Sequence, residues 1–106
     1  MAAQPSAASL QLYGHDLLAA VRYAQAAAVL RQAIGATRMS VATCAQPAGK
    51  TCLVYAYSLY DLGRALLLAG EPRAAAAMLE VRLRIANQLP VVAAELALAR
   101  AAVTRG

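Results

Sequence analysis

The sequence predicts an all-α fold built from antiparallel helical hairpins. Alanine, the residue with the highest helix propensity, fills 29 of the 106 positions, and Phe and Trp are absent. β-Branched residues occur singly or in pairs such as Val91-Val92, so the signals expected of strands are nearly missing. Small side chains also let helices approach closely, which suits stacked antiparallel helices. At this length the chain forms one domain.

The expected elements follow in order from the N-terminus. Residues 1–5 are interpreted as a Pro/Ala/Ser linker that precedes a single helical domain over residues 6–104. Residues 6–38 predict a first hairpin, because each of its two segments carries an apolar stripe at helical spacing. Residues 39–49 lose this periodicity and contain Ser, Thr, Pro and Gly, so they predict a loop.

A second hairpin is expected over residues 50–87. Gly70 ends its first helix, and Pro72 opens its second at a position where a missing N–H costs nothing. This second helix is expected to continue to about Asn87. A last helix over residues 90–104 is then expected to cap the stack.

The two hairpins are related to each other in sequence. When they are superposed, equivalent residues coincide in the pairs Gly14 and Gly63, Ala26 and Ala75, and Leu30 and Leu79. A glycine inside a helix costs roughly 1 kcal/mol relative to alanine, so we expect Gly63 to make room for another helix, with Ala75 as its partner. Each hairpin alone hides only part of its apolar face, so a neighbouring hairpin and a cap are needed.

The second unit, LYDLGRALLLAGEPRAAAAMLEVRL, resembles a tetratricopeptide repeat. The residues that carry the resemblance are the Leu62-Gly63 pair, Gly70 at the turn, Ala75 and Leu79. Leucine stands at three positions where the repeat's consensus has an aromatic residue. The last helix is similar to the solvating helix that closes such arrays. More loosely, this region is similar to repeat domains appended to bacterial serine/threonine kinases. The resemblance implies a short α-solenoid that binds a peptide or partner protein.

In this family the first helix of each hairpin lines a concave groove. Helical spacing places two sets of side chains on that face: Tyr57, Tyr60, Asp61, Arg64 and Leu67 or Leu68 from the second hairpin, and Ala8, Gln11, Leu12, His15 and Leu18 from the first. Tyrosine combines apolar area with a polar tip, as interface anchors do. Asp61 and Arg64 are three residues apart, so an alternative is that they pair with each other. The face lacks the Lys and Asn that clamp a terminal carboxylate, so an apolar ligand is expected.

The stretch TCAQPAGKTC, residues 43–52, permits three interpretations. A phosphate-binding loop requires G-x-x-x-x-G-K-[ST] after a strand, but Cys44 replaces the first glycine. A structural zinc site takes four ligands, whereas Cys44, Cys52 and His15 are the chain's only Cys and His residues. A disulfide across this loop can reach the required Cα separation, and we favour it over two reduced cysteines. An oxidised pair would imply an extracytoplasmic location.

Other function classes find little support in the sequence. The net charge of +5 comes from scattered arginines rather than a basic block, so nucleic-acid binding is not expected. No uncharged stretch reaches the ~18 residues that would span a bilayer, so membrane insertion is not expected. His15 and Asp16 are adjacent on a helix, and their side chains diverge by about 100°. The sequence therefore predicts no enzyme and no cofactor.

The sequence thus predicts a non-enzymatic protein-interaction module. Two alternatives remain, a self-assembling structural homodimer and a small-ligand sensor. Val21 stands where the first hairpin should have its turn glycine, and valine in a left-handed turn is strained by about 1–2 kcal/mol. Either hairpin packing outweighs this strain, or residues 6–36 form one continuous helix that swaps between two chains of a dimer.

Overall fold

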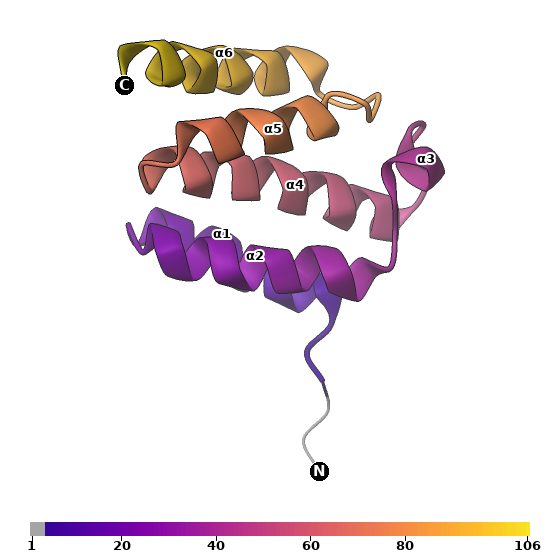
Figure 1. Cartoon of the computed structure of the whole chain (residues 1–106). Helices are drawn as coiled ribbons and strands as arrows, with labels where there is room; N and C mark the ends of the chain where they lie inside the picture. Colours follow the sequence, from indigo (N-terminus) through magenta and orange to yellow (C-terminus); the bar gives the residue numbers. More distant parts are fainter. Residues whose placement is uncertain (1–3) are drawn as a thin grey trace.

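The computed structural model describes residues 4–106, and in this range the chain forms six helices and no strand (Figure 1). The all-α class is therefore confirmed for the described residues. Residues 1–3 of the expected linker lie outside the described part, and residues 4–6 precede the first helix. The helices are α1 (Ala7–Ala19), α2 (Tyr23–Thr37), α3 (Val41–Cys44), α4 (Lys50–Leu68), α5 (Pro72–Arg82) and α6 (Leu89–Arg105).

Through their mutual contacts, α1, α2, α4, α5 and α6 form a stack, whose arrangement Figure 1 shows. α1 packs on α2, α2 on α4, α4 on α5 and α5 on α6, while α1 also contacts α4 directly. The pairs α1–α2 and α4–α5 are the two hairpins, and α6 covers the outer side of α5. No helix within residues 4–106 combines the length and apolar character needed to cross a bilayer.

Each hairpin is held by a leucine that packs against a glycine of the opposite helix. Leu30 and Leu79 are fully buried. A Cβ atom built on Gly14 would lie 2.5 Å from Cγ of Leu30, and one built on Gly63 would lie 2.6 Å from Cγ of Leu79. The sequence predicts Ala75 as the partner of Gly63 on the returning helix. Ala75 is buried, but the side chain that occupies the space beside Gly63 is Leu79.

The turn between α1 and α2 forms without a glycine. Val21 has a φ of 64°, and Gly70, at the equivalent position in the second hairpin, has a φ of 85°. The backbone hydrogen bonds of the two turns also match. In the first turn the N–H groups of Val21 and Arg22 donate to the carbonyls of Leu18 and Leu17. In the second the N–H groups of Gly70 and Glu71 donate to the carbonyls of Leu67 and Leu66. Burying one leucine fully contributes about 1.5–3 kcal/mol, and the first hairpin buries several, so packing outweighs the strain. The alternative of one continuous helix over residues 6–36 is not what the structure shows.

The segment predicted as a loop over residues 39–49 contains one helical turn, α3. The Ser40 side chain accepts a hydrogen bond from the Thr43 N–H at 3.2 Å and so caps this turn. A single turn is too short to produce a visible periodicity, so the sequence does not predict it. The Sγ atoms of Cys44 and Cys52 lie at bonding distance with their Cα atoms 5.4 Å apart, which confirms the predicted pairing and ties α3 to the start of α4.

The second helix of hairpin α4–α5 ends at Arg82, not near Asn87 as predicted. Arg82 is 1% exposed, and its guanidinium donates hydrogen bonds to the carbonyl oxygens of Ile85 and Asn87 and to Oδ1 of Asn87. The chain therefore leaves the helix to wrap around this guanidinium. Ile85 is consequently turned into a small cluster with Cys44 and Cys52.

Substituting Val21 with glycine should stabilise the protein. It removes about 1–2 kcal/mol of left-handed strain, against about 0.5–1 kcal/mol of added backbone entropy in the unfolded chain. Val21 is 66% exposed, so little burial is lost. We expect a gain of up to about 1 kcal/mol in urea unfolding. Ala20→Gly is the control, since Ala20 has a φ of −84° and gains nothing. If Val21→Gly and Ala20→Gly lower the free energy of unfolding equally, the backbone at Val21 is not strained.

Gly63→Ala should lower the free energy of unfolding by about 1–3 kcal/mol, because the new methyl group must displace Leu79 from a packed core. Gly35→Ala is the matched control, since a Cβ there meets no atom within 4 Å. That control should instead gain about 0.5–1 kcal/mol from helix propensity. Thermal unfolding followed by circular dichroism measures both, and a Gly63→Ala protein as stable as Gly35→Ala would show that the close approach is wrong.

The disulfide should be visible in the intact mass, which we expect to lie two hydrogen atoms below the fully reduced value in a single chain. Replacing Cys44 and Cys52 together by alanine should cost about 2–3 kcal/mol of stability by the chain-entropy model for so short a loop. Urea unfolding of the oxidised protein and of the double variant measures this difference. Free thiols at both positions after purification in air would contradict the pairing.

Candidate functional site

A hollow of about 270 Å³ opens between α1 and α4, the first helices of the two hairpins. Its lining consists of Gln11, Leu12, His15, Tyr57, Tyr60 and Asp61. All six of these residues are among those that helical spacing places on the predicted groove face. The hollow exists because α1 and α4 are in direct contact.

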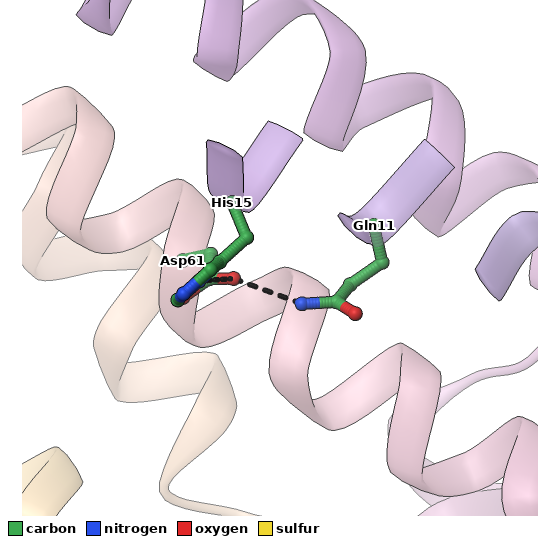
Figure 2. A network of polar contacts seen from close by, with 3 residues as sticks. All are labelled: Gln11, His15 and Asp61. Carbon is green, nitrogen blue, oxygen red and sulfur yellow. Dashed lines mark hydrogen bonds and ion pairs between the residues drawn. The ribbon is translucent and has the colours of Figure 1, made fainter. Parts of the chain in front are cut away.

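The most buried polar group of the hollow is the carboxylate of Asp61, whose side chain is 6% exposed. Figure 2 shows the side chains of Gln11 and His15, from α1, extending towards the side chain of Asp61 on α4. Gln11 Nε2 donates to Oδ2 of Asp61 at 3.0 Å, and His15 Nδ1 lies 3.1 Å from the same oxygen. Residues four apart lie on one face of a helix, so two successive turns of α1 hold one side chain of α4.

The suggested pairing of Asp61 with Arg64 is wrong. Asp61 points to α1, whereas Arg64 Nε lies 3.7 Å from Oε1 of Glu95 on α6. The helices α1 and α6 both contact α4. Asp61 and Arg64 therefore each make a polar contact with a different flanking helix instead of with each other along α4.

The two tyrosines of the hollow differ in burial. Tyr57 is 38% exposed, and Tyr60 is half-buried. Burial raises the pKa of Tyr60 above its usual value, and the carboxylates of Glu95 and Asp61 raise it further, while Arg64 acts in the opposite direction. Burial is thus the largest cause of the raised pKa of Tyr60, and the nearby charges act on it in opposing directions.

Three leucines predicted on or near this face lie elsewhere. Leu67 is partly buried against the main core, and Leu68 is 44% exposed near the end of α4, outside the hollow. Leu18 is 7% exposed and belongs to the core, because it follows the close packing of α1 on α2. Arg64 does not line the hollow either, as its side chain is directed to Glu95.

Two polar residues that matter here were missed by sequence reasoning. Glu95 of α6 is one, since only the packing of α6 on the stack brings it to Arg64. Arg82 is the other, and here a signal was present. It stands seven residues after Ala75 and three after Leu79, on the same buried stripe of α5, a spacing that marks one helix face.

The lining of the hollow combines polar and apolar side chains. Its lining residues include no Ser, Thr or Cys that could act as a nucleophile beside His15. Over residues 4–106 no group of three or more His, Cys, Asp and Glu side chains gathers as a metal ion would require. What the lining does provide is one buried carboxylate, an amide, an imidazole and the apolar surfaces of two tyrosines and a leucine.

Comparison with protein-family models, with curated proteins and with solved structures finds no match to this chain. The class of protein is therefore defined by its architecture: two stacked helical hairpins, closed by α6, with a hollow between their first helices.

Proposed function

We propose that this protein is a tetratricopeptide-like interaction module that binds an apolar peptide segment or helix of a partner protein in the hollow between α1 and α4. The observation that carries the proposal is the composition of this hollow. Large apolar side chains stand exposed at its edge while a held carboxylate lies at its base.

The exposed edge of the hollow has the composition of a binding surface. Leu12 is 60% exposed and Tyr57 is 38% exposed, and both line the same hollow. Tyrosine is enriched at positions that dominate the energy of protein interfaces, because a large ring is buried at a low cost in conformational entropy. A partner that covered this edge would remove apolar surface from water without unpairing any backbone group.

The base of the hollow is pre-organised. The contacts of Gln11 and His15 with Asp61 connect α1 to α4 across two hairpins. A site that is already ordered avoids part of the entropic cost of association. The first helices of both hairpins contribute to the site, which is the arrangement that the resemblance to tetratricopeptide repeats implies.

The size of the hollow favours a partner segment over a metabolite. Its volume of about 270 Å³ lies below the roughly 300–1,000 Å³ typical of sites for drug-sized ligands. It suits one or two side chains of a longer ligand whose remainder lies on the exposed edge. The small-ligand sensor is therefore the less favoured alternative.

The test is a selection of random dodecapeptides displayed on phage against the intact, disulfide-bonded chain, followed by affinity measurements with the enriched peptides. Tyr57→Ala should weaken their binding by at least tenfold, the loss expected when an interface anchor is truncated. Leu98→Ala is the control, because Leu98 is 57% exposed on α6 and does not line the hollow. It should leave the affinity unchanged.

Circular dichroism distinguishes binding from folding in this experiment. We expect the helicity of Tyr57→Ala to stay close to that of the unchanged protein, since Tyr57 is substantially exposed. Loss of helicity would show that Tyr57 supports the core instead. Equal losses of affinity in Tyr57→Ala and Leu98→Ala would place the binding site elsewhere. Self-association that disappears in Tyr57→Ala would favour the homodimer.

A further inference from the structure

The hollow contains a nearly buried carboxylate on a basic protein. The chain carries a net charge of +5 and has only five acidic residues. One of them, Asp61, lines the hollow, and a second, Glu95, acts electrostatically on Tyr60 beside it. Two arginines lie near this region. Arg64 is already engaged with Glu95, and Arg82, which interacts electrostatically with Tyr57, already donates to Ile85 and Asn87. The carboxylate of Asp61 is thus left without a permanent cationic partner, as His15 is a cation only when protonated.

Asp61 also retains hydrogen-bonding capacity. Gln11 and His15 both contact Oδ2 of Asp61. Within residues 4–106 no hydrogen-bond donor contacts Oδ1. Oδ1 is not among the sealed side-chain atoms that lack a partner in residues 4–106, which are Ser58 Oγ and Arg82 Nε. An ionised carboxylate accepts at about four positions over its two oxygens. Oδ1 therefore has no partner within residues 4–106 and is not fully sealed from solvent, so it retains capacity to accept from a donor that arrives with a ligand.

The remainder of the lining selects among cations. Tyr57 and Tyr60 provide aromatic rings, which attract cations placed over their faces. A guanidinium is planar, stacks on aromatic rings and is less strongly hydrated than an ammonium group. It therefore loses less hydration energy than lysine would on entering a hollow walled by tyrosine and leucine. An acidic side chain, by contrast, would be repelled by Asp61 and Glu95.

From these observations we propose that the hollow receives the guanidinium group of an arginine on the bound segment of the partner protein, with Asp61 as its counter-charge and the tyrosines as its walls. This inference rests on the proposed function and specifies the ligand. The apolar edge at Leu12 and Tyr57 then covers the neighbouring residues of the segment, so the preferred sequence is an arginine flanked by apolar residues.

The experiment uses four libraries of capped nonapeptides with random apolar flanks that differ only at the central residue, which is arginine, citrulline, lysine or glutamate. Citrulline keeps the shape of arginine and lacks its charge. Fluorescence anisotropy with the intact, disulfide-bonded chain should give at least tenfold tighter binding for arginine than for citrulline, and weaker binding for lysine and glutamate. N-acetyl-arginine amide, tested alone, should bind far more weakly than the arginine peptides.

Two variants test whether Asp61 causes the preference for arginine over citrulline. Asp61→Asn keeps the shape of the side chain and an acceptor for Gln11, and should abolish the difference between arginine and citrulline while citrulline peptides still bind. Leu12→Ala should weaken both libraries by the same factor. Circular dichroism checks that both variants are folded, and the comparison of arginine with citrulline on the unchanged protein does not depend on either variant.

The outcomes separate this inference from the proposed function. Equal binding of arginine and citrulline peptides overturns the guanidinium site but leaves a peptide-binding module. Lysine that binds as tightly as arginine overturns the choice of guanidinium. N-acetyl-arginine amide that binds as tightly as the peptides would mean a small-molecule site. Binding in none of the four libraries would overturn both the inference and the proposed function.

Discussion

The close packing of a leucine on a glycine determines the geometry of the whole stack. Leu30 fills the space above Gly14, and Leu79 fills the space above Gly63. Since glycine contributes no side chain at these points, the leucine of the facing helix can approach its backbone, and each hairpin closes tightly and in the same register. Two hairpins of equal shape then stack, with α2 on α4 and with α1 in contact with α4. The hollow is a consequence, because it lies where these two first helices meet.

Two buried charged residues illustrate different solutions to the same physical problem. A buried charge must be compensated by partners, since desolvation penalises it strongly. Arg82 meets this requirement with backbone carbonyls and the side chain of Asn87, so it shapes the end of α5 and is sealed from the surface. Asp61 receives its contacts on a single oxygen and remains at the base of an open hollow. The first arrangement is structural, and the second leaves capacity for a ligand.

The disulfide and the Arg82 turn support the same end of the molecule. Ile85 follows Arg82 and packs with Cys44, Cys52 and Tyr55 in a cluster separate from the main core. Ala86 N–H also donates to the carbonyl of Ala45 in the segment after α3. The two longest irregular segments of the stack therefore stabilise each other. The residues that line the hollow belong to α1 and α4 and take no part in this cluster.

What the sequence determined by itself is local. The turn at Gly70 and Pro72, the equivalence of Gly14 with Gly63, and the pairing of two cysteines eight positions apart all follow from backbone preference, helical spacing or short loop length. What the tertiary structure decided is the choice among competing partners. Asp61 had Arg64 nearby on its own helix but pairs with His15, 46 positions away. α5 likewise stops where Arg82 becomes buried, not where helix propensity ends. The physical reason is that helix propensity and spacing act within a few residues, whereas burial and ion pairing depend on how helices pack, and packing places distant residues within bonding range.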